Sequence, residues 1–420
     1  GHPSRSLAVL GVTGTEGKST TVYLIYQLLK LAGEKAGFFS TVMSDTGSGE
    51  LPNPEHQTTP EAPAVQRMLA EMRDSGYEYA VVESSSHGLS PLLNRLGDVA
   101  FDVAVFMNVT HEHLEFHGSW ERYREDKANL FRALDRCGHE KRVGGTVRRI
   151  PSFGLACADD VSAAYFAAAT TKPTRLFSSK GQGSEFRATE IRSDAAGSSF
   201  VVESGGTKRE ARIELPGAFN VDNTLAALAA VAGISSKDWT ELLPLLPSLK
   251  PVRGRMTAID RGQPFEVLVD YAHTPSSFEA VFPPLRARAT ARMLCVFGSG
   301  GERDVEKRPR QGRIAADWFD VVILADEDPR GEDPTELLEM IAAGCPEKKR
   351  GEELFVIPDR PAAIRKAFSL ARPGDIVALL GKGHENSIIY KNGAIPYDEI
   401  AEAEKALAEL GYSSRVKEQA

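Results

Sequence analysis

The fold of the first half of this chain follows from one stretch, Gly11-Val12-Thr13-Gly14-Thr15-Glu16-Gly17-Lys18-Ser19-Thr20. An apolar run at 7–12 enters this stretch, and a helical pattern leaves it at 19–31. A glycine-rich turn between a strand and a helix, ending in Lys-Ser, is typical of a loop that binds phosphate groups. The backbone amides and the helix N-terminus of such a loop face phosphate oxygens, because both carry partial positive charge.

Two side chains of this stretch suit the chemistry of a nucleotide. Lys18 would reach the β and γ phosphates, and the hydroxyl of Ser19 would bind Mg²⁺. The spacing departs from the common form, because Val12 stands where a first glycine is usual. The alternative is an ordinary glycine turn before a helix, with an incidental lysine.

Short apolar runs alternate with helical patterns along most of the chain, which predicts a parallel sheet covered by helices on both faces. From 181 to 215 polar and apolar residues alternate instead around a turn, as they do in antiparallel hairpins. A proline-rich stretch then approaches 248, and we place a domain boundary there because helices tolerate internal proline poorly. The expected strands are 7–12, 79–82, 103–106, 267–270, 293–297, 321–325 and 376–380, and the expected helices are 19–31, 60–73, 119–134, 220–232, 276–288 (interrupted by Pro283-Pro284), 333–343 and 361–371.

These patterns predict an α/β protein of two domains. Residues 1–248 would form a central phosphate-loop ATPase domain on a mostly parallel sheet, and residues 249–420 a smaller Rossmann-like α/β domain. A length of 420 residues agrees with two or three domains at ~150 residues each.

Composition excludes several classes of protein. The 58 acidic residues outnumber the 50 basic ones, which argues against a broad nucleic-acid-binding face. No apolar stretch approaches the ~20 residues that a membrane helix needs, and the run at 7–12 is too short for a signal peptide. The four cysteines lie far apart without a CxxC pair, so neither a zinc ribbon nor a disulfide framework is indicated. We expect a cytoplasmic monomer with reduced thiols.

Nine further segments follow the phosphate loop and extend over nearly the whole chain. They are Thr58-Thr59-Pro60-Glu61, Glu83-Ser84-Ser85-Ser86-His87-Gly88-Leu89, Asn108-Val109-Thr110-His111-Glu112-His113-Leu114-Glu115-Phe116-His117-Gly118, Phe219-Asn220-Val221-Asp222-Asn223, Gly254-Arg255-Met256, Asp270-Tyr271-Ala272-His273-Thr274-Pro275, Gly298-Ser299-Gly300-Gly301-Glu302-Arg303-Asp304, Asp328-Pro329-Arg330 and Gly381-Lys382-Gly383-His384-Glu385. In this order they resemble the Mur ligases, ATP-dependent enzymes that form amide bonds in peptidoglycan synthesis. The resemblance is strongest to the MurE type, the UDP-N-acetylmuramoyl-tripeptide synthetases, which add the third residue of the stem peptide.

The resemblance implies a reaction between two small-molecule substrates, a muramoyl-peptide donor and an amino-acid acceptor. A donor carboxylate and ATP form an acyl phosphate, an amine attacks it, and phosphate leaves. Mur ligases of this type also carry an N-terminal domain that holds the UDP of the donor. The first strand begins near residue 6 and leaves no room for such a domain. We expect either a shortened form of a longer protein or a natural short homologue whose donor need not be a UDP-sugar.

The resemblance also implies a metal site. Glu83 matches a family residue that binds Mg²⁺, and His113 matches one that helps bind a second Mg²⁺. Lys127 matches a lysine that CO₂ carbamylates, which turns a cation into an anion directed toward the metals. With Lys18, these three residues are the expected catalytic group. The alternatives are a surface carboxylate at Glu83 and an ordinary helical lysine on a solvated face at Lys127.

By the same resemblance, ATP contacts come from both domains. The phosphates would meet Gly14, Thr15, Gly17, Lys18, Ser19 and Thr20. Asn220 and Asn223 match residues near the adenine, Asp270 a residue at the ribose, and Arg255 a residue near the phosphates. An alternative role for Asn220 is to cap its helix.

For the donor, Thr58, Thr59 and Ser85 match residues that contact the muramoyl-peptide. A family arginine that follows the Ser-Ser-His stretch is assigned to Arg95, with two residues inserted after Leu89.

For the acceptor, the matching positions are those that hold diaminopimelate: Arg303, Asp328, Arg330, Gly381 and Glu385. The two arginines would fork onto a carboxylate and Glu385 would meet an ammonium. The usual Asp-Asn-Pro-Arg reads Glu327-Asp328-Pro329-Arg330 here, which adds a carboxylate. The added charge would repel one carboxylate of diaminopimelate or recruit another amine, unless this acidic loop simply faces water.

Three functions follow from these observations. The first is a MurE-like ligase that adds a diaminopimelate-like amino acid. The second is a related ligase with another donor, such as a γ-glutamyl or other peptide chain. The third is a nucleotide-binding homologue without ligase activity, although Glu83, His113 and Lys127 are all retained.

Overall fold

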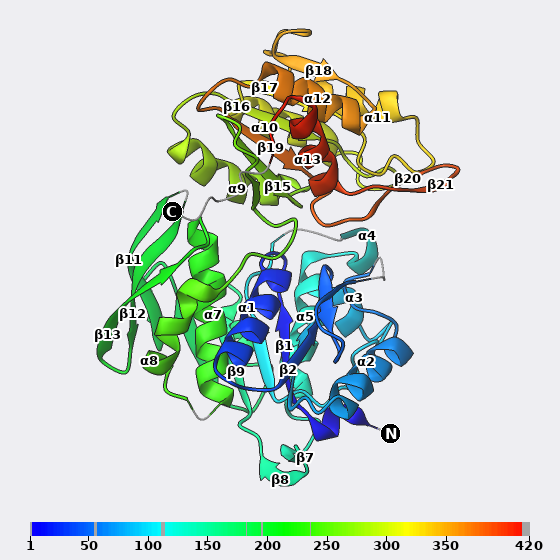
Figure 1. Ribbon diagram of the computed structural model, residues 1–420. Coiled ribbons are helices and arrows are strands. Elements are labelled where there is room, and N and C mark those ends of the chain that lie inside the picture. The colour runs from blue at the N-terminus through cyan, green and yellow to red at the C-terminus, as the bar shows by residue number, and fades with distance from the viewer. Residues whose placement is uncertain are drawn as a thin grey trace. The chain divides into compact units, whose positions relative to one another are not determined.

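The structure is a computed structural model that describes residues 2–53, 57–110, 114–181, 183–194, 196–235 and 237–413, without the side chains of 114 and 115. The chain divides into two compact units, Gly1–Lys250 and Pro251–Ala420 (Figure 1). No helix in the described ranges combines the length and the apolar character needed to cross a bilayer.

The N-terminal unit is built on a sheet in which 11 strands are described, in the order β13-β12-β11-β10-β9-β6-β1-β5-β2-β3-β4. Its centre is parallel, and β1 lies between β5 and β6 with Leu10 level with Val81 and Val103. Every residue of these three strands is buried, as expected of continuous apolar runs in a parallel sheet. The central strands are β1 (Ala8–Thr13), β2 (Ala36–Phe39), β5 (Tyr79–Glu83), β6 (Val103–Phe106), β9 (Phe153–Cys157) and β10 (Thr174–Ser178).

Helices cover both faces of this sheet (Figure 1). Val9, Val82 and Phe106 share one core with α2 (Ala62–Asp74), α5 (Trp120–Ala133) and α6 (Ala163–Ala167). The alternate strand residues point to the other face, where α1 (Lys18–Leu31) and α7 (Ala218–Ile234) pack against the strands and against each other. Short helices α3 (Ser86–Leu89), α4 (Leu114–His117) and α8 (Trp239–Leu242) and the 3₁₀ helices η1 (Pro3–Ser6) and η2 (Leu243–Ser248) complete the described helices of the unit.

The antiparallel segment expected at 181–215 is present, and the structure shows that it extends the same sheet. Strands β11 (Phe186–Asp194), β12 (Gly197–Ser204) and β13 (Thr207–Ile213) form an antiparallel meander. A parallel pair between β10 and β11, with Phe177 level with Phe186, joins this meander to the parallel strands. Two further hairpins come from strands that the sequence did not indicate: β3 (Met43–Asp45), β4 (Leu51–Pro52), β7 (Glu140–Val143) and β8 (Thr146–Arg149).

The C-terminal unit has a six-stranded sheet in the order β14-β15-β19-β16-β17-β18, and only β14 (Thr257–Ile259) runs antiparallel to its neighbour. The other strands are β15 (Glu266–Asp270), β16 (Met293–Phe297), β17 (Val321–Leu324), β18 (Leu354–Val356) and β19 (Ile376–Leu380), with a separate hairpin of β20 (Ser387–Tyr390) and β21 (Gly393–Pro396). One face packs on α9 (Pro275–Arg288), α10 (Lys307–Trp318) and α11 (Pro334–Ala342), and the other on α12 (Arg360–Leu370) and α13 (Glu399–Glu409). The expected α/β class is therefore confirmed in both units.

The expected interruption at Pro283-Pro284 is wrong, because α9 runs through both prolines. Proline removes the bonds that residues 283 and 284 would donate to the carbonyls of Glu279 and Ala280. Both of these residues are exposed, so water can satisfy their carbonyls. Phe278, Phe282 and Leu285 are buried on the opposite side, and their packing holds the helix.

Candidate functional site

The phosphate loop connects β1 to α1 and is shaped by Gly17. Gly17 is the N-cap of α1 with a φ of 80°, in the left-handed region that favours glycine. A Cβ at this position would lie 2.5 Å from Oδ1 of Asn223 on α7. The ammonium of Lys18 donates to the carbonyl of Thr15 at 2.6 Å, which folds this half-buried side chain back over the loop. Thr20 is half-buried in the first turn of α1.

Asn108 fixes the other side of the loop, a role that the sequence reasoning missed. Its Oδ1 accepts from the amides of Thr15 and Glu16 at 3.1 and 2.8 Å, and its carbonyl accepts from Thr15 N at 2.9 Å. Asn108 follows β6, whose carboxyl end lies beside that of β1 in the parallel sheet. This placement at the end of the neighbouring strand is the signal that could have identified it.

Glu83 lies beside Ser19 with its carboxylate almost completely buried. Ser19 Oγ donates to Glu83 Oε1 at 3.0 Å, and the carboxylate also accepts from the amide and the hydroxyl of Thr41 at 2.8 and 3.0 Å. Glu83 is 1% exposed, so the alternative of a surface carboxylate is wrong. A carboxylate and two hydroxyls are the oxygen donors that Mg²⁺ prefers, so these residues fit that ion. Thr41 is the member of this group that the sequence reasoning missed.

Lys127 is buried on α5 beside the same loop. Its ammonium donates to the carbonyl of Gly14 at 2.6 Å and lies 4.4 Å from the ring centroid of Tyr123. With 1% exposure it does not belong to a solvated face, which excludes the alternative of an ordinary surface lysine. The predicted metal ligand His113 lies outside the described residues, together with His111 and Glu112. Within those residues, no three His, Cys, Asp or Glu side chains gather as a metal site would require.

The two asparagines of α7 are buried, and Asn223 lies against the phosphate loop. Asn223 Oδ1 accepts from Thr21 Oγ1 on α1 at 3.2 Å, next to its close approach to Gly17. Asn220 donates from its side-chain Nδ2 to the carbonyl of Pro216 at 2.8 Å. The N-cap of α7 is Gly217 and has no side-chain capping bond, so the capping alternative for Asn220 is wrong.

Three of the four predicted donor residues lie together, and Thr58 is half-buried beside them in the chain. Thr59 Oγ1 and Ser85 Oγ are 2.8 Å apart, and Thr59 is almost fully buried. Arg95 donates to the carbonyl of Thr59 at 2.9 Å and pairs with Glu61 at 2.5 Å. Ser86, which follows Ser85 in the chain, contacts His117 at 3.0 Å. His117 in turn contacts Asp126, the neighbour of Lys127, at 2.8 Å. Polar contacts through Ser86 and His117 therefore connect the Thr59 and Ser85 pair to α5.

In the C-terminal unit, Arg255 and Asp270 lie close to the place where the loop at 254 meets the loop at 383–384. Asp270 accepts from the amides of Met256 and Ala272, both at 2.7 Å, and Arg255 lies 4.6 Å from the ring of Tyr271. Burial raises the pKa of Asp270, and Arg255 opposes this shift. A Cβ on Gly254 would lie 2.3 Å from the backbone at 383–384, so the two loops meet backbone to backbone.

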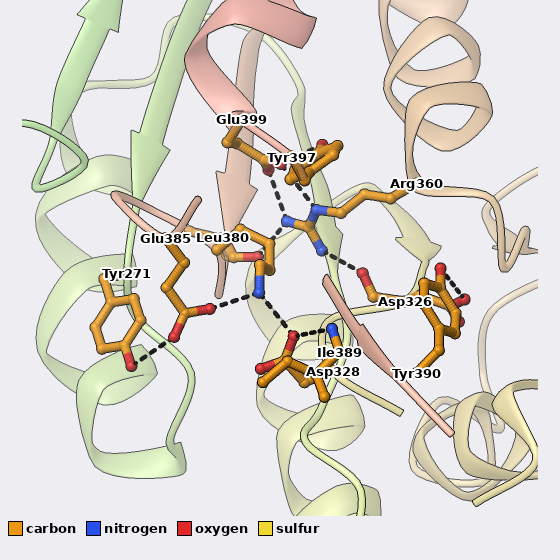
Figure 2. Close-up of polar contacts among 11 residues, drawn as sticks. Tyr271, Asp326, Asp328, Arg360, Leu380, Glu385, Ile389, Tyr390, Tyr397 and Glu399 are labelled. Carbon is orange, nitrogen blue, oxygen red and sulfur yellow. Dashed lines mark hydrogen bonds and ion pairs between the residues drawn. The ribbon is translucent and has the colours of Figure 1, made fainter. Parts of the chain in front are cut away.

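Lys382 is the centre of the predicted acceptor residues, although sequence reasoning did not select it. Its fully buried ammonium contacts Asp328 Oδ1 at 2.9 Å and Glu385 Oε2 at 2.5 Å (Figure 2 labels the two carboxylates). Burial alone would lower the pKa of Lys382, but Glu385 and Asp328 outweigh it and raise that pKa. Ile389 N also donates to Asp328 Oδ1 at 2.9 Å. Asp328 is 8% exposed, so the alternative of a loop carboxylate facing water is wrong.

Glu327 adds a third carboxylate to this cluster. It is 8% exposed, and its Oε2 has no hydrogen-bond partner among the described residues. A Cβ on Gly381 would lie 2.8 Å from that oxygen, which brings Gly381 into the group. Burial raises the pKa of Glu327, so the carboxylate is costly to ionise here.

The two predicted acceptor arginines take different positions. Arg330 has a φ of 55° and its amide donates to the carbonyl of Ile389 at 2.9 Å, next to the Asp328–Ile389 contact. Arg303 is exposed on the loop after β16. The structure thus brings together Asp328, Gly381, Glu385 and the backbone of Arg330.

Comparison with known proteins places the chain among the Mur ligases. The family model for the Mur ligase middle domain matches residues 12–231, and that for the Mur ligase glutamate ligase domain matches residues 254–383. UDP-N-acetylmuramyl-tripeptide synthetase of Treponema denticola is 57% identical over 418 residues, which cover 97% of this chain and 77% of that protein. UDP-N-acetylmuramoyl-L-alanyl-D-glutamate–2,6-diaminopimelate ligase of Geobacillus kaustophilus is 37% identical, over 98% of this chain and 81% of that protein. A solved structure of a ligase with that same name aligns with a TM-score of 0.65 and 30% identity, covering 97% of this chain and 79% of the other.

Proposed function

The chain belongs to the Mur ligase family, and we propose that it is an ATP-dependent carboxylate–amine ligase of the tripeptide-synthetase type. It would join a diamino acid to the free carboxylate of a UDP-muramoyl-dipeptide. One observation carries this proposal beyond the family name. Ser19, Thr41 and Glu83 form an oxygen cluster around the buried Glu83 carboxylate, beside a lysine-bearing phosphate loop, which suits the activation of a carboxylate with ATP.

Two bond exchanges make up the reaction. A donor carboxylate oxygen attacks the γ phosphorus of ATP, the bond to ADP breaks, and an acyl phosphate forms. The acceptor amine then attacks the acyl carbon, phosphate leaves with the bonding electrons, and the amine loses a proton. The residues act chiefly by positioning: Lys18 and the loop amides hold phosphate oxygens, while Asn108 and Asn223 keep the loop in shape.

Mg²⁺ would be held by Ser19 and Glu83, with His113 and Lys127 as further contributors. The ion supplies charge neutralisation at the phosphates. Glu83 already lies against Ser19, and Thr41 orients its carboxylate through two hydrogen bonds.

Carbamylation of Lys127 is part of this proposal. Its amine lies beside the phosphate loop and is closed off from water. A carbamate nitrogen keeps one hydrogen, so the bond to the Gly14 carbonyl can be made by both forms. The new carboxylate would replace a buried positive charge by a negative one, which suits a neighbouring Mg²⁺.

Donor and acceptor would contact different units. Thr58, Thr59, Ser85 and Arg95 would bind the donor, since three of them already form one polar cluster. The carboxylates of Asp328 and Glu385 would face the distal ammonium of a diamino acid. Arg330, with Arg303, would face its carboxylate. The remaining nucleotide contacts would come from Asn220, Arg255 and Asp270.

Phosphate release tests this function. The protein is mixed with ATP, Mg²⁺, UDP-N-acetylmuramoyl-dipeptide and one amino acid at a time, with diaminopimelate and lysine first. We expect release only when the donor and one diamino acid are both present, with a product heavier by that amino acid less water. A Glu83→Gln variant serves as the matched control and should release little phosphate. Release that is independent of the donor, or absent with every amine despite ATP binding, would refute the proposal.

A further inference from the structure

A completely buried ion pair lies next to the acceptor residues and joins the starts of two helices. Arg360 is the first residue of α12, and Glu399 is the first residue of α13. The guanidinium contacts the carboxylate twice, from Nε to Oε2 at 2.9 Å and from Nη2 to Oε1 at 2.6 Å. Both side chains have 0% exposure, and Figure 2 shows the guanidinium of Arg360 next to Glu399, with Leu380 on one side and Asp326 on the other.

The same guanidinium binds the backbone of both acceptor loops. Nη1 donates to the carbonyl of Asp326 at 3.1 Å, and Nη2 donates to the carbonyl of Leu380 at 2.6 Å. Each carbonyl stands one residue before a member of the acceptor cluster, Glu327 in one loop and Gly381 in the other. Strand β16 separates β17 from β19 in the sheet, so Arg360 bridges two loops that are not direct neighbours.

Tyr397 anchors the far end of the second loop. Its hydroxyl donates to Glu399 Oε2 at 2.5 Å, and its amide donates to the carbonyl of Asn386 at 2.9 Å. Asn386 directly follows Glu385. The loop at 381–386 is therefore tied at its start through Arg360 and at its end through Tyr397, and both ties meet on Glu399.

Stability alone does not account for this arrangement. The desolvation of two buried charges offsets most of their attraction, and apolar residues of similar volume often stabilise a core as well or better. Two of the four guanidinium contacts instead hold backbone carbonyls of different loops, and the other two hold the guanidinium itself on Glu399. The spacing that they set is the one across which Lys382 reaches Asp328 at 2.9 Å.

We propose that Arg360, through Glu399 and Tyr397, is a positioning residue that sets the distance between the two acceptor loops and thereby the affinity for the acceptor amino acid. This inference rests on the proposed function, because it takes the Asp328–Glu385 cluster as the acceptor site. The proposal predicts that removal of the Arg360–Glu399 bridge weakens the affinity for the acceptor and leaves the affinities for ATP and the donor unchanged.

The test compares steady-state constants of four variants with the wild-type protein. Arg360→Met with Glu399→Met removes both charges together, so no unpaired charge is left in the core. Tyr397→Phe removes one hydroxyl, and Arg360→Lys keeps the charge but has too few donors for all four contacts. The matched control is Arg365→Met, because Arg365 also joins α12 to α13, through Glu402 and Glu409, but is partly exposed and binds neither acceptor loop.

We expect the KM for the acceptor to rise about tenfold in the double variant, less in the two single variants, and by no more than about twofold in the control. The KM values for ATP and donor should stay within about twofold. An unchanged KM for the acceptor overturns the proposal. So does an equal rise in the KM values for acceptor, ATP and donor that is proportional to the fall in melting temperature among the variants. If the double variant does not fold, the acceptor KM of Tyr397→Phe and Arg360→Lys decides by the same criterion. A wild-type protein that ligates no amino acid overturns the proposed function itself, which is a different result from an unselective change among active variants.

Discussion

Replacing Gly17 by alanine tests whether the phosphate loop requires a residue without a side chain. Its φ of 80° costs a non-glycine residue about 1–2 kcal/mol. The new Cβ would also lie 2.5 Å from Oδ1 of Asn223, which is 4% exposed and bound to Thr21. Because the side-chain amide of Asn223 cannot move into solvent, the overlap should cost about 1–3 kcal/mol more. We therefore expect Gly17→Ala to lower the free energy of unfolding of the N-terminal unit by about 2–5 kcal/mol.

Gly33 provides the control that separates the two costs. Its φ is 88°, and a Cβ there would meet nothing within 4 Å. Gly33→Ala should therefore show the backbone cost alone, about 1–2 kcal/mol. The difference between the two variants then measures the overlap with Asn223.

Urea unfolding followed by circular dichroism measures both variants, and nucleotide titration measures ATP binding. Gly17→Ala should weaken ATP binding, whereas Gly33→Ala should not, because Gly33 lies at the other end of α1. Adding Asn223→Ala to Gly17→Ala should recover part of the lost stability, since the overlap disappears. Equal destabilisation by the two glycine variants, or strict additivity with Asn223→Ala, would refute the reasoning from this close approach.

Three other changes have defined outcomes. Lys127→Ala should abolish ligation and, if the carbamate role is right, added formate but not bicarbonate should restore some phosphate release; unchanged turnover would exclude that role. Thr41→Val should raise the Mg²⁺ concentration needed for half-maximal rate several-fold, because Glu83 loses a hydroxyl that orients it; a Mg²⁺ titration with an unaltered midpoint would contradict this. Burial raises the pKa of Asp222 from 3.8 to about 6, so its ionised form costs stability in full above that pH, and the cost declines as the pH falls from about 6 to the ordinary pKa of 3.8. Asp222→Asn should therefore stabilise the protein by about 1–3 kcal/mol at pH 8 and by about half as much at pH 5, and melting curves with the same gain at both pH values would show that another cause operates.

The local pattern was sufficient to predict most central elements of the fold. The strand, turn and helix around Gly17 were predicted because apolar runs and glycine positions act within a few residues of one another. The expected strand at 103–106 agrees residue for residue with β6, and the antiparallel segment at 181–215 was also found. The Mur ligase membership likewise needs only the order of short segments along the chain.

Other features depend on contacts between distant residues, and no pattern along the chain contains them. Proline propensity predicted a break in α9, but the burial of Phe278 and Phe282 outweighs the lost bonds. The alternation at 181–215 did not show that β11 would pair with β10 and extend the parallel sheet.

The site shows the same division. Residue types and their spacing predicted a phosphate loop, and the resemblance to the Mur ligases implied a metal-binding carboxylate and an acceptor cluster. Only the fold could bring Thr41 to Glu83, place Lys382 between Asp328 and Glu385, and bury Arg360 against two loop carbonyls. The order of residues along the chain thus indicates which kind of chemistry the chain carries, because residue types and short spacings are properties of the chain itself. Which groups share a buried environment follows only from the folded structure, because burial and charge pairing arise between residues that are far apart in the chain.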